Sequence, residues 1–583
     1  MGVPVLTGWL AGDMAAGLMA TIGAFTTLYG NDRPYLNRAI HLAVIALCFS
    51  LAVMLGVWAA EIPLMVVPTI VLIAVASTFL CNALQTGPPG AYMFALACAA
   101  GTAMPVSHLM IPQIGLLIFL GGAFAWLAHM AGALFQLRGP ERTAVAAAAQ
   151  AVAHFMEAVG TPTEDGARHT AALALHHAWT VLVAYQPARP RPSGSLSRLR
   201  ALNRELHLLF VGVMNAPIPD GRSLAMNADK ARRIAAQAKE TREQDERTDP
   251  KHIPLGHHGP LESLRENLRS WSPALLAAAR VGAATAIAGT IGALLGLERA
   301  YWIMAAAVLI LYQGLDWMRS LQRGIERMIG TLIGLVLAGV ILAAHPEGLW
   351  LVATLMLVQF IIEMLVVRNY ALAVIFITAA ALTIASGGQP ASDIGHLLWV
   401  RGEDTFIGCA TGLVILAMTS PRSAEIRIPR ELVSTLVALK RVLARAAKGD
   451  ATTDAAQRAR RDLQHRTFSL LQAYDASVGA TPWHRNAAER SWPTVSATQR
   501  LAYRVLSVCW LLENAGTGSA DMARTLFGPD GEREIGRTLL ALSNAIRAGT
   551  QPAPPPHLPE FIDTEMRSLH DSLVYGGEVA PSC

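Results

Sequence analysis

The sequence predicts an all-α protein that crosses a membrane many times. Three observations lead to this prediction. Hydrophobic residues make up 53% of the 583 residues, charged residues make up only 15%, and the apolar residues gather in eleven long runs. An ordinary soluble domain carries about 25% charged residues. The composition therefore indicates that much of the chain faces lipid rather than water.

The apolar runs approach the roughly 17–25 residues that a helix needs to cross a bilayer. The run 299–313 is short, so it is expected to be tilted little or to be covered by protein. In chain order, the first group of runs covers 5–28, 38–60, 62–82, 90–107 and 113–136, and the second covers 273–296, 299–313, 324–344, 348–366, 369–386 and 401–420.

Two polar segments follow these groups and read as amphipathic helices. The predicted domains are a first transmembrane half at 1–137, a helical domain with a charged linker at 138–270, a second transmembrane half at 271–420 and a C-terminal helical domain at 421–583. This gives two helix bundles of about five and six spans, each followed by a helical domain.

Charge placement predicts one orientation. Arg319, Arg323 and Arg327 are expected in a short loop between two spans, and Lys and Arg bias such loops to the cytoplasm. With this loop inside, both helical domains lie in the cytoplasm. The charge placement thus predicts a multi-pass membrane protein whose two helical domains are cytoplasmic.

The two halves resemble each other. Arg38-Ala-Ile-His and Arg323-Gly-Ile-Glu lie 323 − 38 = 285 residues apart, and Leu182-Val-Ala-Tyr and Leu471-Gln-Ala-Tyr lie 471 − 182 = 289 apart. We interpret this as duplication of a membrane-plus-cytoplasmic unit, with parallel repeats. The same offset puts the counterpart of 273–296 mostly before Met1. The first half is therefore expected to lack its opening helix, and a missing twelfth span stays open.

Several short motifs, in this order, resemble the fusaric acid resistance (FUSC) family. They are Tyr301-Trp302, Arg327-Met-Ile-Gly-Thr-Leu-Ile-Gly334, Arg368-Asn-Tyr370 and Arg401 with Asp404 and Gly408, with Pro88-Pro-Gly-Ala-Tyr92 in the first half. The family includes bacterial aromatic acid exporters and is distantly similar to aluminium-activated malate transporters. The resemblance implies an inner-membrane exporter of aromatic carboxylates or related anions, and a periplasmic membrane-fusion adaptor as partner.

Ionisable residues inside the spans are candidates for function, because they are costly in lipid. Glu363, one turn after Gln359, could cycle between protonated and charged forms and couple export to protons. Its alternative role is to pair with Arg368. Arg280 offers planar donors to a carboxylate, or its side chain extends to the lipid headgroups.

Four further residues complete the predicted site. Arg401 and Asp404 are expected to open the last span from outside, as a gate or as a solvated helix entry. Arg323 and Arg327 either orient the protein and contact anionic lipid or line the substrate entrance. We thus predict substrate binding by Arg280, Arg323, Arg327 and Arg401, and proton coupling by Glu363 and Asp404.

The sequence favours a proton-coupled secondary exporter of small organic anions. A passive anion channel of the malate-transporter type and a non-transporting membrane scaffold are the alternatives. The motifs of P-loop ATPases, HExxH metalloenzymes and GxSxG hydrolases are absent from the sequence, so no enzyme, metal or cofactor is predicted. A net charge of +5 gives no support for a nucleic-acid partner. A homodimer stays open.

Overall fold

The computed structural model describes a chain whose regular elements are all helical. It divides into two compact units, each built from two separate segments: the membrane unit (1–137 and 258–421) and the polar unit (138–257 and 422–583). No β-strand occurs in the described residues. These are all residues except 1, 32, 88, 103–108, 187–193, 216–220, 241–259, 269–271, 298–299, 313–316, 367–368, 386–392, 420–423, 479–481 and 576–583.

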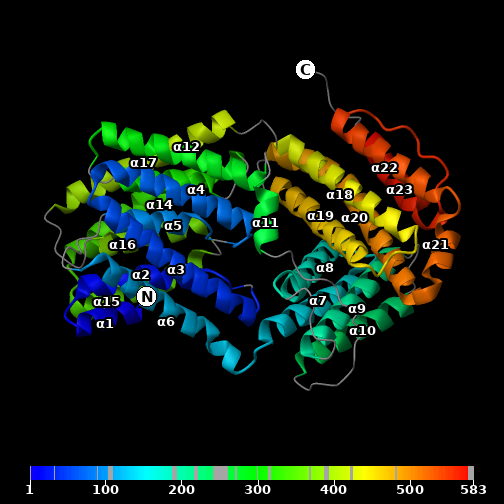
Figure 1. Cartoon of the computed structure of the whole chain (residues 1–583), viewed down its shortest axis with the longest axis horizontal. Helices are drawn as coiled ribbons and strands as arrows, with labels where there is room; N and C mark the ends of the chain where they lie inside the picture. Colours follow the sequence, from blue (N-terminus) through cyan, green and yellow to red (C-terminus); the bar gives the residue numbers. More distant parts are fainter. Residues whose placement is uncertain are drawn as a thin grey trace. The chain divides into compact units, whose positions relative to one another are not determined.

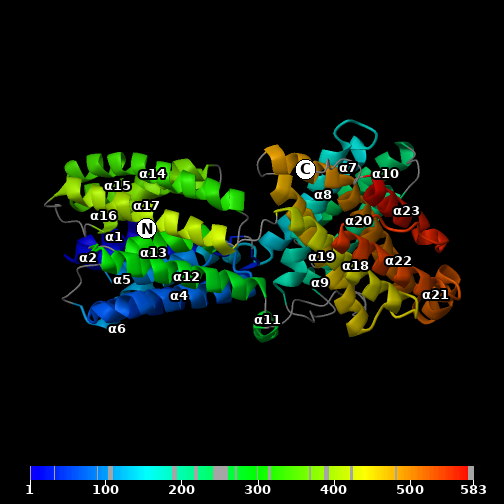
Figure 2. The same cartoon turned by 90° about the horizontal axis from the view of Figure 1, so that it is seen from above.

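The membrane unit is a bundle of apolar helices that run side by side, together with one short polar helix, Pro260–Asn267 (Figures 1 and 2). In chain order they are α1 Gly2–Leu10, α2 Met14–Ala24, η1 Phe25–Leu28, α3 Tyr35–Ala60, α4 Pro63–Ala83, α5 Tyr92–Gly101, α6 Ile111–Met130, η2 Ala131–Leu134, α11 Pro260–Asn267, α12 Pro273–Leu294, α13 Ala300–Leu311, α14 Trp317–Ala343, α15 Gly348–Val366, α16 Tyr370–Ala385 and α17 Ile394–Thr419.

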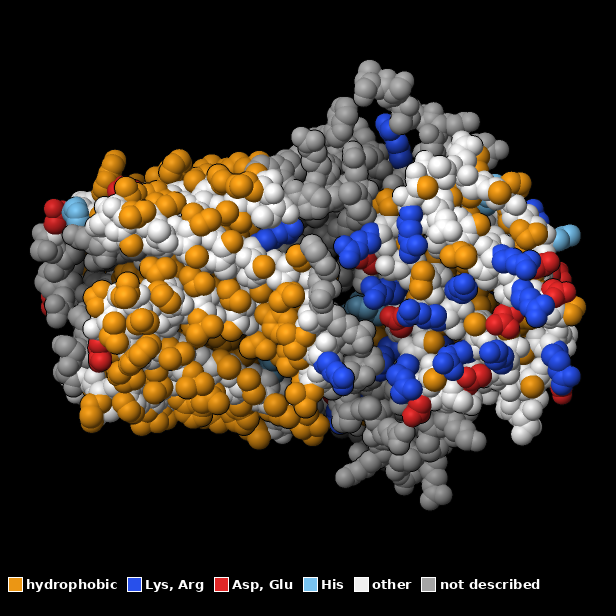
Figure 3. All heavy atoms as spheres, turned by 45° about the horizontal axis from the view of Figure 1, so that its top comes forward, with side chains coloured by type: hydrophobic (Ala, Val, Ile, Leu, Met, Phe, Trp, Pro, Cys, Tyr) orange, Lys and Arg blue, Asp and Glu red, His pale blue; other side chains and the backbone are white. Residues whose placement is uncertain are grey.

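Six stretches of this unit are long and apolar enough to cross a membrane. Hydrophobic side chains also cover the face of the unit seen in Figure 3. The chain is therefore an all-α, multi-pass membrane protein, as its composition predicts. The six stretches are Tyr35–Ala60, Pro63–Ala83, Ile111–Leu134, Pro273–Leu294, Ser320–Ala343 and Gly348–Leu365; shorter apolar helices are Met14–Leu28, Tyr92–Gly101, Tyr301–Leu311 and Tyr370–Ala385.

The predicted single span 5–28 is wrong, because two helices share it. Gly12 takes a left-handed backbone conformation (φ +76°), and Asp13 caps α2 by accepting a hydrogen bond from Ala16 N at 3.0 Å. α1 then folds back onto α2. A Cβ on Gly8 would lie 2.5 Å from Gly17 Cα, so glycine permits this close approach.

The predicted arginine loop is also wrong over most of its length. α14 begins at Trp317, so Arg323 and Arg327 lie within a helix. Arginine is a good helix former, and the four-residue spacing of these arginines suits one face of a helix. α17 likewise begins at Ile394, which places Arg401 about two turns inside the helix rather than at its entry.

Some predictions concern residues that lie outside the described part of the chain. Residues 241–259 of the linker, Pro88 and Arg368 lie outside the described residues, and so does the side chain of Arg319.

The two halves of the membrane unit form the same helix pairs. α3 packs on α5 and α6 as α14 packs on α16 and α17, and α2 packs on α6 as α13 packs on α17. The first helices pack across the halves: α12 on α4, and α1 on α15. This correspondence supports the internal repeat inferred from the sequence.

α1 occupies the position that the sequence analysis left empty. Adding the offset of 285 to its bounds, 2 and 10, gives 287–295, which overlaps the last part of α12 and extends one residue beyond it. The first half thus has a short counterpart of α12. This short helix is hidden in the sequence because 5–28 reads as one apolar run.

The polar unit contains two helix groups, one from each segment. α7 packs on α8 and α10 as α18 packs on α19 and α22, and α9 meets α20 between the groups. Its helices are α7 Gly139–Ala158, α8 Glu164–Trp179, the π-turn η3 Thr180–Ala184, α9 Ser195–Asn215, α10 Gly221–Lys239, α18 Ala424–Ala446, α19 Asp454–Val478, α20 Pro482–Ala515, η5 Gly516–Gly518, α21 Ser519–Phe527, α22 Gly531–Ala548 and α23 Glu560–Tyr575.

We predict that the polar unit loses stability as the pH falls below about 6.5. His176 on α8 stacks on Phe468 of α19 with ring centroids 3.6 Å apart, and burial together with nearby histidines lowers the pKa of His176 to about 3. Between these pH values the unfolded chain binds a proton at this position that the folded unit does not, so acid favours unfolding by up to about 1.4 kcal/mol per pH unit.

Unfolding midpoints of the full chain between pH 7.5 and 4 test this expectation. His176→Gln should flatten the pH dependence, whereas His177→Gln, at the exposed neighbouring position, is the matched control and should not. A native protein whose midpoint is constant between pH 6.5 and 4 would contradict the prediction.

Candidate functional site

The site is built around α13, the most enclosed of the apolar helices. Every residue from Tyr301 to Tyr312 is buried, so protein covers this short helix, which was one of the two alternatives predicted. It packs against α12, α17 and α5 (Figure 2). Glycines of α17 allow the closest approach, since a Cβ on Gly408 would overlap the carbonyl oxygen of Ile303.

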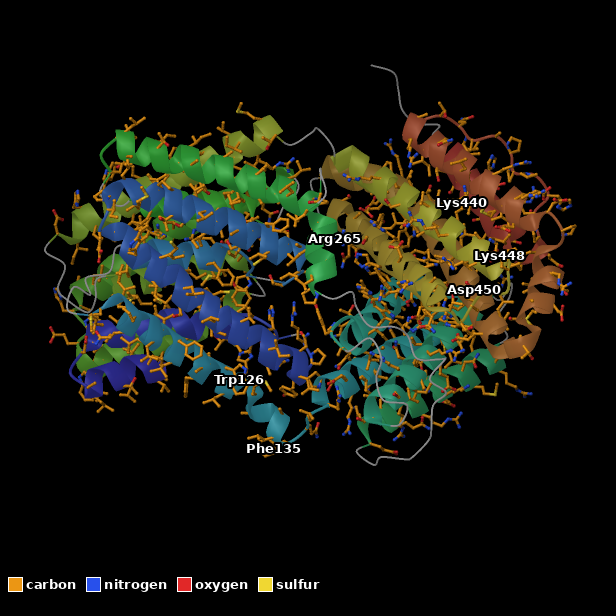
Figure 4. All side chains as sticks on the ribbon, viewed as in Figure 1. Trp126, Phe135, Arg265, Lys440, Lys448 and Asp450 are labelled. Atoms are coloured by element: carbon orange, nitrogen blue, oxygen red, sulfur yellow. The ribbon has the colours of Figure 1, made fainter. Side chains whose placement is uncertain are left out.

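Two kinds of contact join neighbouring helices here, and close backbone approach at glycine and other small residues is one of them. The other is a polar side chain that bonds a backbone carbonyl across the helix pair. Trp126 of α6 donates from Nε1 to Ala39 O of α3 at 2.8 Å (Figure 4). Such contacts position helices in lipid, where the hydrophobic effect between helices is absent.

Two arginines lie buried beside α13. Arg327 of α14 and Arg401 of α17 are each 3% exposed, and their guanidinium groups are close enough to interact electrostatically. Asp404, one turn after Arg401 on α17, is fully buried and interacts with it. The formal charge of these three groups is 2 − 1 = +1.

Aromatic rings surround the two guanidinium groups. Arg401 lies over the ring of Trp302 at 3.6 Å, which is a cation–π contact. Arg327 donates a hydrogen bond to the Tyr370 hydroxyl and lies near Tyr92. We call this set the arginine–aromatic cluster, and it consists of Arg327, Arg401, Asp404, Trp302, Tyr92 and Tyr370.

Three buried N–H donors of the cluster make no hydrogen bond with any described residue. They are Nε of Arg327, Nε of Arg401 and Nε1 of Trp302. A buried donor without an acceptor is costly, and a buried net charge costs more. An anion with acceptor oxygens would satisfy both, so the cluster is suited to a carboxylate.

Of the other predicted site residues, Arg323 lies at the edge of the cluster, and Arg280 and Glu363 lie outside it. Arg323 is half-buried on α14, with its guanidinium over the Tyr370 ring at 5.4 Å, so it extends the cluster towards a more exposed position. Arg280 donates from Nη2 to Thr419 O at 2.8 Å, where a cation favours the C-terminus of α17. Glu363 is exposed on α15 and accepts a hydrogen bond from Gln359 Nε2 at 2.9 Å.

The structure thus brings together Arg327, Arg401 and Asp404 and keeps Arg280 and Glu363 out of the cluster. Burial of Arg401 and Asp404 also rules out the solvated helix entry. The aromatic members were missed as site residues, although Trp302, Tyr370 and Tyr92 belong to the motifs quoted for the family resemblance. Their presence in these motifs was the sequence signal that could have identified them as members of the site.

Fold and cluster together define the class: a multi-pass, all-α membrane protein whose core holds a positively charged, ring-lined site. Residues 287–415 match the family model described as "Fusaric acid resistance protein-like". The chain therefore carries a fusaric acid resistance protein-like domain, which confirms the resemblance predicted from the sequence. All cluster members except Tyr92 lie within the matched residues.

Two relatives extend this finding. The chain is 28% identical over 615 aligned residues to the uncharacterized membrane protein YvaC of Bacillus subtilis (strain 168), and the alignment covers 98% of this chain and 93% of the relative. It is 34% identical over 159 residues to the uncharacterized protein YhfK of Escherichia coli (strain K12), covering 26% of this chain and 21% of that protein. No solved structure matches the chain.

Proposed function

We propose that the protein exports small organic anions, aromatic carboxylates in particular, across the inner membrane of a bacterium. In this proposal the arginine–aromatic cluster is the binding site and the polar unit lies in the cytoplasm. The observation that carries it is the buried surplus of positive charge next to three unsatisfied N–H donors.

Each part of the cluster suits one part of such a substrate. Guanidinium groups bind a carboxylate through two parallel N–H donors, and this contact is strongest where water is excluded. The rings of Trp302, Tyr92 and Tyr370 offer flat apolar surface to an aromatic ring. An aliphatic anion would make only the first of these contacts, so aromatic anions should bind more tightly.

Proton coupling is assigned first to Asp404 and second to Glu363. Asp404 is buried and interacts with Arg401, so a change in its protonation alters the charge that a substrate meets. Glu363 is exposed and outside the cluster. This ordering refines the prediction from the sequence, in which Glu363 ranked first.

We predict that Asp404→Asn abolishes the stimulation of export by a pH gradient but leaves substrate exchange intact, because the asparagine keeps the shape and cannot ionise. The measurement is benzoate uptake into inside-out vesicles with an imposed pH gradient, while potassium and valinomycin clamp the membrane potential. Glu363→Gln is the comparison variant. It should respond like the native protein if Asp404 carries the coupling, whereas loss of the stimulation in Glu363→Gln alone would assign the coupling to Glu363.

Three outcomes would contradict this proposal. Undiminished gradient-driven accumulation in Asp404→Asn would exclude Asp404. If the benzoate flux of the native protein depends neither on the pH gradient nor on an uncoupler, the protein is instead a passive anion channel. Absence of any flux would favour the scaffold.

A periplasmic adaptor and a homodimer remain predictions. The first comes from the family resemblance, and the second was left open by the sequence. Cross-linking in intact cells, followed by mass spectrometry of the purified protein, would test both.

A further inference from the structure

The polar unit contains a cleft that transport through the membrane unit does not use. It has a volume of about 70 Å³ and lies where the first helix group, through α9 and the end of α8, meets α19 and α20 of the second. A space of this size holds a few waters or one small ionic group.

Charge is the distinguishing feature of this cleft. Its lining includes Arg200, Arg204, Arg460 and Arg461, but only one carboxylate, that of Glu513. Arg460 Nη1 donates to Glu513 Oε2 at 3.1 Å, and Arg204 Nη2 lies 3.6 Å from the same oxygen. The formal charge of the lining is 4 − 1 = +3.

Burial makes this surplus costly. Arg200 is 3% exposed and Glu513 6%, and the side chains of Arg460 and Arg204 are 13% and 21% exposed. Charges held this far from water interact more strongly than exposed ones. Structural roles account for part of the set, since Arg200 Nε donates to Leu182 O at 2.8 Å. The described lining nevertheless holds four arginines and one carboxylate.

Two neutral side chains point to a ligand as well. Asn203 is 5% exposed, and its Oδ1 makes no hydrogen bond with any described residue. The amide can turn to present its two N–H donors instead. His207 accompanies it, with Nδ1 2.8 Å from Asn203 O, and burial lowers the pKa of this histidine, so it adds no charge at neutral pH.

We propose that this cleft binds a small oxyanion with two or more negative charges, of the phosphate or dicarboxylate type. The arginine forks match the oxygens of either group. The ligand would bridge helices from both repeats, and so would tie the two helix groups of the polar unit together. This inference does not depend on the proposed export, because no cleft residue belongs to the membrane unit.

Isothermal titration calorimetry of the purified full chain tests the proposal, at constant ionic strength and with phosphate, malate and benzoate as separate probes. Arg461→Ala should weaken phosphate or malate binding at least about 10-fold, as expected for loss of a charged donor. Arg458→Ala is the matched control, because it is exposed on the same helix and outside the lining, and it should change affinity less than about 2-fold.

Glu513→Gln gives the more discriminating result. It raises the charge of the lining from +3 to +4, so a binding site should hold its anion several-fold more tightly, whereas a purely structural ion pair predicts no such gain. Chromatography of each variant verifies that it is folded.

The three probes distinguish between the possible classes of ligand. Binding of phosphate alone identifies a phosphoryl ligand, binding of malate alone identifies a dicarboxylate, and binding of both supports the shared site. Failure of both to bind overturns the proposal. Equal affinity for benzoate, or equal losses in Arg461→Ala and Arg458→Ala, also overturns it, because these results indicate nonspecific charge attraction.

Discussion

Arg401→Lys is expected to lower aromatic carboxylate export at subsaturating substrate by about 10- to 100-fold, the loss that follows when a charged hydrogen-bonding group is removed. Lysine keeps the charge, so the balance with Asp404 is preserved. Lysine has no planar guanidinium to place over Trp302, where Cζ of Arg401 lies 3.6 Å from the ring centroid, and it cannot donate two parallel hydrogen bonds to a carboxylate. Initial rates of benzoate uptake into inside-out vesicles measure the effect.

The matched control is Arg280→Lys. Arg280 bonds a backbone carbonyl at an exposed position, which a lysine can also do, so its rate should stay within about 2-fold of the native rate. Trp302→Leu is a second variant without a charge change. It should lower the export rate of aromatic anions and leave that of aliphatic anions unchanged. Equal rates in Arg401→Lys and native vesicles would contradict the account.

Gly408→Ala is expected to destabilise the membrane unit by roughly 1–3 kcal/mol, the usual cost of overpacking. The added Cβ would overlap the carbonyl oxygen of Ile303 and lie 2.7 Å from the Cβ of Ala306. Both atoms belong to α13 and sit on or next to its backbone, so α13 and α17 must separate. Since Arg401 and Trp302 lie on these two helices, export should fall as well.

Gly402→Ala is the matched control on the same helix. There the new Cβ would lie 3.3 Å from Leu335 Cδ1, the end of a flexible side chain that can move. Alanine favours helix over glycine by up to about 1 kcal/mol, so Gly402→Ala should be neutral or mildly stabilising. The thermal unfolding midpoint of the detergent-purified protein should therefore fall in Gly408→Ala and stay the same or rise in Gly402→Ala. Midpoint shifts of the same direction and size in both variants would contradict this packing.

The helices of the membrane unit could be predicted from the sequence, but the residues at which they begin and end could not. Long apolar runs predicted nearly every helix of the membrane unit, because lipid imposes length and composition together. The end of a helix depends on local signals that hydropathy does not register. Gly12 and Asp13 divide one apolar run into two helices, whereas Arg323 and Arg327 continue a helix that was expected to be a loop.

The candidate site shows a similar limit. Arg401 and Asp404 stand out in the sequence as charges near a span, but whether they face solvent or protein depends on the neighbouring helix. The packing of α17 against its neighbours buries them, and its close contact with α13 brings Trp302 under Arg401. Glu363 and Asp404 therefore looked alike in the sequence, although one proved exposed and the other buried.

Equilibrium binding of radiolabelled benzoate to the purified full chain tests whether the arginine–aromatic cluster binds an aromatic carboxylate. We expect saturable binding that is weakened at least about 10-fold by Arg401→Lys and is unchanged by Arg461→Ala in the polar unit. Native-like binding in Arg401→Lys, or loss of binding only in Arg461→Ala, would contradict it.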